Sequence, residues 1–283
     1  MLDRLEMYIA QIQTDPASFL ITMAYVWGVI LFSLILHECA HGYVALRCGD
    51  PTAKMMGRLS LNPARHLHPI GTLCMFLFGF GWARPVPVNP RNFRNFRRDD
   101  FLVSIAGITV NLTIFLVSAL LSCIVSRFLW TQELVDIMLA EFGEIDILLN
   151  PFYGWVLSFE GMEGSIGASS IINDGHAMIE SFGVFMQHPW LIWVQRLLLL
   201  LAQVNLTLAV FNLMPIPPLD GFHVVNDILL KGKLRLSGRV FQITQVVLIA
   251  LVLTGVLNKA LSFCVSNLYE AVLKLFMLLT GRM

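Results

Sequence analysis

Long apolar runs alternate along this chain with shorter segments that carry most of its charge. A helix needs about 20 apolar residues to cross the hydrocarbon core of a bilayer. Runs of that kind cover Phe19–Leu36, Phe101–Phe128, Trp190–Leu213 and Val240–Leu257. We expect the first helix to continue to about Cys48. Ala260–Leu279 is a weaker fifth run, so the pattern leaves open whether one or two spans follow residue 240.

A shorter apolar run, Pro69–Trp82, differs from the others in length and composition. It has only 14 residues and contains Gly71, Gly79 and Gly81. Such a run is too short for a confident span, but it suits a re-entrant segment or a β-hairpin that lines a cavity. The predicted fold is an all-α polytopic membrane protein with about five transmembrane helices and this one short re-entrant or β-hairpin element.

The composition agrees with a membrane protein. Hydrophobic residues make up 57% of the 283 residues and charged residues only 13%, about half the charged fraction of a soluble domain. So little polar surface excludes both a disordered chain and a soluble globular protein. The 19 Lys and Arg residues balance the 19 Asp and Glu residues, which excludes a nucleic-acid partner recruited by bulk positive charge.

Basic residues are concentrated in some of the polar segments and absent from another. Residues 47–65 and 84–98 together carry nine Lys and Arg residues, whereas residues 131–189 carry nine acidic residues and no basic one. Basic residues favour cytoplasmic loops. We therefore expect residues 49–100 and 215–239 to be cytoplasmic, and the N-terminus and the acidic segment to lie outside.

The acidic segment, residues 129–189, is long and partly apolar. Glu133–Phe142 looks amphipathic, and Phe152–Leu157 is aromatic with a glycine inside it. Two interpretations stay open: an interfacial helix and loop on the outer leaflet, or a lid over a lateral entrance. In either case we expect an acidic extracytoplasmic or interfacial insertion within a single membrane-embedded domain of residues 1–283.

The inner end of the first span carries the sequence His-Glu-Cys-Ala-His at residues 37–41. On a helix, His37 and His41 project from one face about one turn apart, and this arrangement binds a divalent metal, usually zinc. Glu38 stands beside that site, where a carboxylate can take a proton from water. Ionisable groups are costly at membrane depth, so three of them within about one turn indicate a functional site.

A catalytic zinc ion usually has three protein ligands and one open position. The candidates for the third ligand are five histidines and one aspartate: His66, His68, His176, His188, His223 and Asp220. The predicted topology places His176 and His188 on the opposite side of the membrane. Asp220 is the best candidate, because it follows prolines that end the third long run on the inner side. Gly221 allows a tight turn toward the metal.

Several further motifs accompany these candidates. Asn212 precedes Pro217–Gly221, and Gly57–Pro63 and Phe80–Pro90 lie between the first two long spans. With the His-Glu-Cys-Ala-His motif in an apolar helix, they resemble the site-2 protease family of intramembrane zinc metalloproteases. The similarity is to the compact prokaryotic branch, which has no PDZ or CBS domains, and it covers roughly residues 19–227.

The resemblance implies a role for each matching residue. His37, His41 and Asp220 would bind one zinc ion, and Glu38 would activate the attacking water. Asn212 would steady the oxyanion or bind the substrate backbone. These assignments are expectations that follow from the family.

The resemblance also implies an architecture. The family has a core of three transmembrane helices, which here would be residues 19–48, 101–128 and 190–213. The membrane region between the first two contributes short strands that can pair with an unwound substrate. This expectation suits the short Pro69–Trp82 run.

The chain departs from the family pattern at a few positions. The second core helix has Ala106–Asn111 without the usual proline, a change that concerns helix shape rather than chemistry. His68 stands where close relatives often have an acidic residue. We expect His66 and His68 to be structural or to line the cavity rim. The 129–189 segment is larger than the resemblance leads us to expect.

The sequence therefore predicts an intramembrane zinc endopeptidase. It would hydrolyse peptide bonds within or near transmembrane segments of membrane proteins, in regulated intramembrane proteolysis or in clearance of membrane-protein remnants. Its partners would be this substrate and the lipid bilayer, with the oligomeric state left open. We expect a multi-pass protein of a prokaryotic inner (cytoplasmic) membrane, with its active site toward the cytoplasmic side.

Three other classes fit the sequence less well. A membrane di-iron oxygenase needs more histidines than the five that the topology places on the cytoplasmic side or the inner end of a span. A metal transporter would need a repeated set of intramembrane carboxylates. A non-catalytic adaptor with the same fold is disfavoured because every expected catalytic group is present in the sequence.

Overall fold

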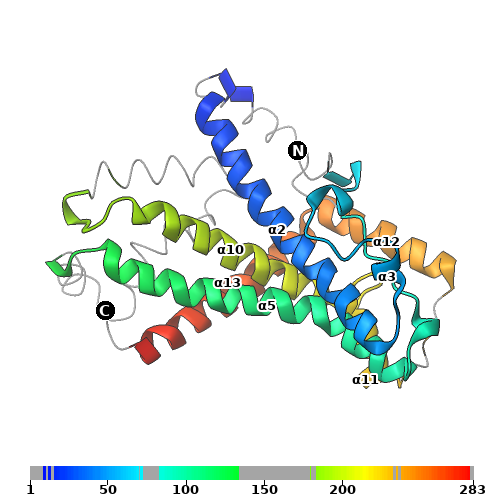
Figure 1. Cartoon of the computed structure of the whole chain (residues 1–283). Coiled ribbons are helices and arrows are strands. Elements are labelled where there is room, and N and C mark those ends of the chain that lie inside the picture. The colour runs from blue at the N-terminus through cyan, green and yellow to red at the C-terminus, as the bar shows by residue number, and fades with distance from the viewer. Residues whose placement is uncertain are drawn as a thin grey trace. The chain divides into compact units, whose positions relative to one another are not determined.

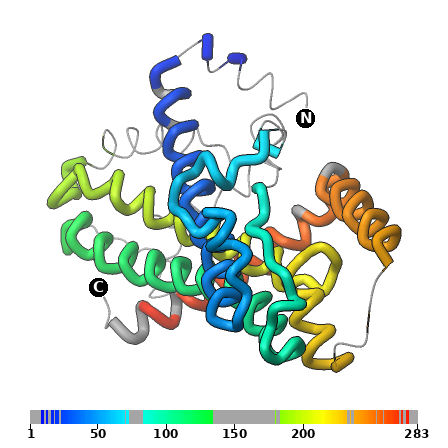
Figure 2. Tube along the Cα trace, turned by 45° about the vertical axis from the view of Figure 1, so that its right-hand side comes forward, coloured from blue at the N-terminus to red at the C-terminus, as the bar shows by residue number. Residues whose placement is uncertain are grey.

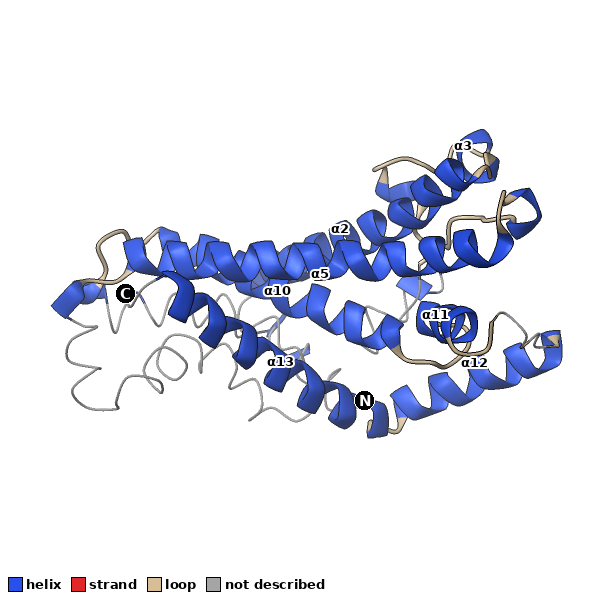
Figure 3. Ribbon diagram, turned by 90° about the horizontal axis from the view of Figure 1, so that it is seen from below, coloured by secondary structure: helices blue, strands red, loops and turns tan. Residues whose placement is uncertain are grey.

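In the computed structural model the chain consists of helices joined by turns and short loops. The structure describes residues 9–10, 12–13, 16–69, 71–72, 83–133, 179, 183–231, 234 and 237–280. Every regular element in these ranges is a helix, and they contain no sheet (Figure 3). The prediction of a mostly helical protein is therefore confirmed. Most of the Pro69–Trp82 run, and most of the acidic segment, lie outside the described residues.

The long helices cover the apolar runs of the sequence, and their arrangement can be followed in Figure 1. The α-helices are α2 (Pro16–Cys48), α3 (Thr52–Met55), α5 (Phe96–Leu129), α10 (Leu191–Leu213), α11 (Asp220–Ile228), α12 (Gly238–Leu253) and α13 (Val256–Thr280). Short 3-10 helices cover Pro63–Arg65, Pro90–Asn92 and Gly183–Phe185. Among the described residues, three helical stretches are long and apolar enough to cross a membrane: Phe19–Cys48, Phe96–Leu129 and Leu191–Leu213. They coincide with the three predicted core helices, and the total number of spans stays a prediction.

Packing divides the chain into two compact units. Unit 1 comprises Met1–Val29, Phe115–Gln203 and Ser266–Met283, and unit 2 comprises Ile30–Ile114 and Val204–Val265. All the residues predicted to carry the chemistry belong to unit 2. The single domain expected from the sequence stays a prediction.

The C-terminal end of α2 is closed by a glycine. Gly49 follows Cys48 with φ +110°, a backbone conformation that only glycine adopts without strain. The Asp50 amide then donates to the carbonyl of Ala45 at 2.9 Å, and the Gly49 amide donates to that of Leu46 at 3.3 Å. This pair of hydrogen bonds is the Schellman pattern of helix ends. It stops α2 two turns after the second predicted histidine ligand.

Asp50 connects two loop segments of unit 2. Its buried carboxylate accepts hydrogen bonds from the backbone amides of Thr52 at 3.1 Å and Asn89 at 2.7 Å. It also accepts one from the Asn92 side chain at 2.7 Å. Burial raises the pKa of Asp50, but these hydrogen bonds together lower it more, so the pKa lies below its ordinary value. The ionised carboxylate holds the chain after α2 against the chain before α5.

Residues 83–89 form an extended stretch, visible in Figure 2 as a teal tube without helical turns. After it, α5 begins with reciprocal hydrogen bonds. The Asn95 side chain accepts from the Arg98 amide at 3.3 Å, and the Asp99 carboxylate accepts from the Asn95 amide at 2.8 Å. These bonds satisfy backbone donors that a helix start leaves free, as in a capping box. They set where α5 starts relative to the extended stretch.

The predicted Val240–Leu257 helix differs from the structure at its C-terminal end. The helix α12 starts at Gly238, where the Ser237 hydroxyl accepts from the Val240 amide at 3.4 Å. It ends at Leu253 because Gly255 adopts φ +75°. Hydropathy alone does not register this break, since the residues on both sides are apolar. A small core in unit 2 forms around three buried leucines, Leu219, Leu248 and Leu257.

Unit 1 contains its own polar contact between apolar helices. The buried Gln195 side chain of α10 donates to the Ser126 hydroxyl of α5 at 2.6 Å. Near the end of α5, Trp130 forms an isolated antiparallel bridge with Met186. The aromatic rings of Phe115 and Tyr269 lie 5.8 Å apart. None of these residues was predicted to have a chemical role.

In unit 2 a buried hydrogen bond joins α10 to α2. Asn205 Nδ2 donates to Ser33 Oγ at 2.9 Å, and both residues are fully buried. We predict that a double-mutant cycle with Asn205→Ala and Ser33→Ala gives a favourable coupling of about 0.6 kcal/mol, the average for hydrogen bonds between membrane helices. Unfolding in mixed detergent micelles measures it. Additive effects of the two substitutions would contradict the prediction.

Candidate metal centre

The two histidines of the motif lie on one face of α2, as their spacing predicts. Their rings meet edge to face with centroids 4.6 Å apart, and their Nε2 atoms are 3.0 Å apart. His37 is 6% exposed, and the side chain of His41 is 12% exposed. Both Nε2 atoms therefore point into the same small, nearly buried space.

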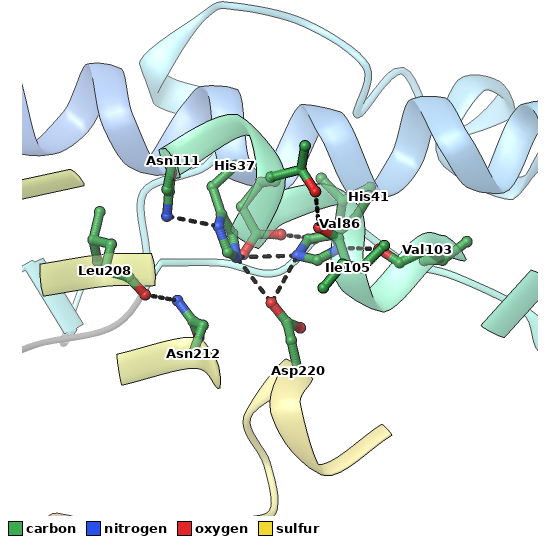
Figure 4. A network of polar contacts seen from close by, with 11 residues as sticks. His37, His41, Val86, Val103, Ile105, Asn111, Leu208, Asn212 and Asp220 are labelled. Carbon is green, nitrogen blue, oxygen red and sulfur yellow. Dashed lines mark hydrogen bonds and ion pairs between the residues drawn. The ribbon is translucent and has the colours of Figure 1, made fainter. Parts of the chain in front are cut away.

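Asp220 reaches this space from the first residue of α11. A proline-rich turn separates it from α10, and Gly221 makes that turn possible. A Cβ atom at Gly221 would lie only 2.2 Å from the carbonyl oxygen of Leu213, so no other residue fits this close return of the chain. Asp220 Oδ2 lies 3.3 Å from Nε2 of His37 and 3.3 Å from Nε2 of His41 (Figure 4).

The three atoms fit the ligand set of a zinc ion. Zinc bonds of about 2.0–2.1 Å at the tetrahedral angle separate two ligand atoms by about 3.3 Å, and the observed separations are 3.0, 3.3 and 3.3 Å. His37, His41 and Asp220 are the group of metal-binding side chains found among the described residues. Two imidazoles and one carboxylate leave the fourth tetrahedral position for water or substrate.

The helix α5 orients both imidazoles without supplying a ligand. His41 Nδ1 lies 2.7 Å from the carbonyl oxygen of Val103, which can only accept a hydrogen bond, so Nδ1 carries the proton. His37 Nδ1 lies 3.0 Å from Nδ2 of the fully buried Asn111, whose Oδ1 has no hydrogen-bond partner among the described residues. The flipped orientation of this amide exchanges its two end atoms and places Oδ1 where it accepts from an Nδ1–H group. Protonated Nδ1 atoms leave both Nε2 lone pairs free for a metal.

Gly107 of α5 lies directly against the two rings. A Cβ atom there would be 2.5 Å from His37 Cε1 and 2.5 Å from His41 Nε2. The absence of a side chain thus creates the room in which the imidazoles sit. The sequence prediction assigned no role to Gly107 or Asn111. A buried asparagine within an apolar helix was the available signal, because such a group needs a partner.

Glu38 extends from α2 toward the loop that precedes α5. Its Oε2 atom accepts a hydrogen bond from the backbone amide of Val86 at 2.7 Å. This carboxylate is adjacent in sequence to the ligand His37. The role of proton acceptor that the motif predicts for Glu38 stays a prediction.

The remaining candidates lie elsewhere. Asn212 is on α10, where its side-chain amide donates to the Leu208 carbonyl at 3.0 Å (Figure 4). His66 Nε2 lies 2.7 Å from the Ser60 carbonyl oxygen, and His68 Nδ1 accepts from the Gly71 amide. These contacts suit the structural role expected for both histidines. His188 is exposed before α10, and His176 lies outside the described residues.

His223 contacts a carboxylate other than Asp220. Its Nδ1 atom lies 3.2 Å from Asp100 Oδ2 of α5, and this hydrogen bond raises the pKa of His223. One turn further along α11, the carbonyl of Asp227 accepts from Arg97 Nε at 2.8 Å. Two polar contacts therefore attach α11, and with it Asp220, to the start of α5.

Asp227 is a buried carboxyl next to these contacts. It is only 2% exposed, and its carboxyl oxygens have no hydrogen-bond partner among the described residues. Burial, together with the nearby charge of Asp100, raises the pKa of Asp227 to about 6. His223 and Arg97 oppose this shift with their positive charge.

Comparisons with known proteins identify the family of this chain. The model of peptidase family M50 matches residues 25–255. "Putative zinc metalloprotease YwhC" of Bacillus subtilis is 35% identical over 210 residues, which are 74% of this chain and 71% of that protein. "Putative zinc metalloprotease Rip2" of Mycobacterium tuberculosis is 39% identical over 90 residues, 30% of this chain and 34% of that protein. No solved structure matches the chain.

The apolar helices and the His-His-Asp centre define an integral membrane zinc metallopeptidase. The chain belongs to peptidase family M50, the site-2 protease family. The resemblance drawn from the sequence motifs is thereby confirmed, as are the enzyme class and the zinc cofactor.

Replacement of Gly107 by alanine tests the packing of the two rings. In a helix this change normally favours folding by about 1 kcal/mol, but here the new methyl group would push the imidazoles apart. We predict zinc affinity at least about 10-fold weaker for Gly107→Ala, the range typical of groups that orient metal ligands. Competition with a zinc chelator measures it.

Gly28→Ala on α2 is the matched control, because nothing lies within 4 Å of a Cβ atom at that position. It should bind zinc as the wild type does. Unchanged zinc affinity in Gly107→Ala would contradict the packing described above.

Asp227 predicts a dependence of stability on pH. The folded protein holds this proton up to about pH 6, whereas an unfolded chain releases it near the ordinary value of 3.8. Wild-type stability therefore falls as the pH rises through this interval. Asp227→Asn cannot titrate, so it should be more stable than the wild type near neutral pH and no more stable at about pH 4. Thermal unfolding of both proteins in detergent at several pH values measures this. A stability difference between the two proteins that does not change with pH would refute the prediction.

Proposed function

We propose that this M50 peptidase hydrolyses peptide bonds within or near transmembrane segments of membrane-protein substrates. His37, His41 and Asp220 bind one catalytic zinc ion, and Glu38 is the general base. The observation that carries the proposal is the convergence of the three ligand atoms at 3.0–3.3 Å, with Glu38 next to the first ligand. Two of the ligands lie in a helix apolar enough to span the membrane.

Each residue has a defined part in the reaction. Bound zinc would lower the pKa of water and polarise the scissile carbonyl. Glu38 accepts a proton from the attacking water as the new carbon–oxygen bond forms. It then delivers this proton to the leaving amine nitrogen as the carbon–nitrogen bond breaks. His37, His41 and Asp220 hold their positions throughout.

Asn212 would assist by donating a hydrogen bond to the oxyanion or to the substrate backbone. In the structure its amide donates to Leu208 of the same helix. A rotation of the side chain would exchange this local hydrogen bond for one to the substrate. Its proposed role therefore belongs to the substrate-bound state.

The substrate helix must unwind before it can react, since its peptide bonds are protected by internal hydrogen bonds. A strand on the enzyme could replace those bonds by edge pairing. We place this pairing near residues 57–82. The described part of that region, residues 57–69 and 71–72, contains turns and a 3-10 helix and no strand. The rest of this region, residues 70 and 73–82, lies outside the described residues.

We further infer that the protein resides in a prokaryotic inner membrane with the centre toward the cytoplasmic side. The support is the distribution of basic residues, which flank the centre in residues 47–65 and 84–98. The same topology supports a role in regulated intramembrane proteolysis or in clearance of membrane-protein remnants. Water would reach the site from that side.

The proposal is tested by cleavage of a model transmembrane substrate in proteoliposomes, with zinc content measured by mass spectrometry. We predict that Glu38→Gln retains zinc but loses at least about 100-fold in kcat, the contribution of a general base. Asp220→Ala should lose zinc and activity together. A chelator should abolish wild-type cleavage, and added zinc should restore it.

Glu133→Gln is the matched control, because it makes the same chemical change at an exposed position of unit 1. It should cleave at the wild-type rate. Wild-type kcat in Glu38→Gln would refute the role of Glu38, and full activity of zinc-free protein would refute the proposal as a whole.

A further inference from the structure

The extended segment before α5 lies against the turn of α2 that follows Glu38. Gly42 is one turn after Glu38 on the same face of the helix. A Cβ atom at Gly42 would lie 2.8 Å from Val86 Cγ1 and 2.6 Å from Leu59 Cδ2. Glycine at this position therefore allows the backbone of the segment to come within hydrogen-bonding distance of the Glu38 carboxylate.

The segment offers one backbone donor at this point, and Glu38 accepts it. Val86 stands between Pro85 and Pro87, which have no N–H group. Its own amide, on a residue only 7% exposed, donates to Glu38 Oε2 at 2.7 Å. The flanking prolines also restrict the backbone, so the direction of this N–H group is largely fixed.

Arg58 holds the same segment from its other side. Its guanidinium is buried, and Nη2 donates to the carbonyl of Arg84 at 2.7 Å and to that of Pro85 at 3.1 Å. The Arg84 amide donates to the His66 carbonyl at 2.7 Å. The polar backbone groups from Arg84 to the Val86 amide are thus all used within the protein, and none of them is free for edge pairing with a substrate.

Arg58 is an unusual residue to bury at this place. Among the described residues it forms no ion pair, and its Nε atom has no hydrogen-bond partner. Burial lowers the pKa of Arg58, and the nearby negative charge of Glu38 partly opposes that effect. A buried cation is costly unless it forms hydrogen bonds. The hydrogen bonds of Arg58 go to two carbonyls of the segment that contacts Glu38.

We propose that Arg58 is a positioning residue for Glu38 and acts through the Pro85–Val86–Pro87 segment. The segment fixes one carboxylate oxygen, Oε2, with the Val86 amide, and the other oxygen stays available for proton transfer. The inference rests on the proposed role of Glu38 as general base. It predicts loss of turnover without loss of zinc when the segment cannot hold the carboxylate.

The first test compares Val86→Pro with Val86→Ala in the full-length protein. Both change the side chain, but only proline removes the amide that donates to Glu38. We expect kcat of Val86→Pro to be about 10-fold below that of Val86→Ala, the effect typical of groups that orient a reacting residue. KM and zinc content should be similar in the two variants. Equal kcat values, with Glu38→Gln inactive, would overturn the positioning role and leave the proposed function standing.

The second test addresses Arg58 and stays decisive if Val86→Pro does not fold. Arg58→Met should lower kcat with zinc retained, and Arg58→Lys should recover part of it, because a lysine can donate to the same carbonyls. Arg91→Met removes an exposed arginine of the following turn and should behave as the wild type. Wild-type kcat in Arg58→Met, or equal kcat in Arg58→Met and Arg58→Lys, would overturn the role of Arg58.

A third measurement does not depend on activity. Hydrogen–deuterium exchange of the peptide containing Val86 should be faster in Glu38→Ala than in the wild type, since the amide loses its acceptor. Glu133→Ala should leave this exchange unchanged. Unchanged exchange in Glu38→Ala would show that the contact does not order the segment and would overturn the proposal. Wild-type activity of Glu38→Gln would instead refute the proposed general base, on which this inference rests.

Discussion

The centre depends on satisfying every imidazole nitrogen inside an apolar helix. Four nitrogen atoms of His37 and His41 need defined partners, and water is scarce at membrane depth. The helix α5 supplies the partners of the two Nδ1 atoms through Val103 and Asn111. With the rings held in this way, the two Nε2 atoms face Asp220 and each other. A helix without a ligand thus determines which nitrogen atoms can bind the metal.

The third ligand needs a different kind of support, because Asp220 begins a short amphipathic helix outside the three candidate spans. Gly221 allows the chain to return against the end of α10. The contacts of His223 with Asp100 and of the Asp227 carbonyl with Arg97 attach the new helix to α5. The same helix α5 therefore positions all three ligands. It contacts the rings of His37 and His41 directly, and it holds Asp220 through the helix α11 on which that residue lies.

Much of this could be predicted from local sequence, and the rest could not for identifiable reasons. Apolar runs gave the helices, and the spacing of His37 and His41 gave two ligands, because both signals act within one helix. The break at Gly255 was missed, since its apolar neighbours hide a change in backbone conformation. The contacts of Gly107 were missed because they depend on how two helices approach each other. No local pattern reports such an approach.

Among the residues that the structure describes, the contacts that set the metal centre are confined to one of the two units. The metal ligands, Glu38 and the residues that orient them all belong to unit 2, Ile30–Ile114 and Val204–Val265. The acidic segment falls within the sequence range of unit 1, and the described residues of that range contribute none of the contacts at the centre. The ligand geometry is set by α5 and by the loop that contacts Glu38, and both lie within the sequence range of unit 2 where they make these contacts.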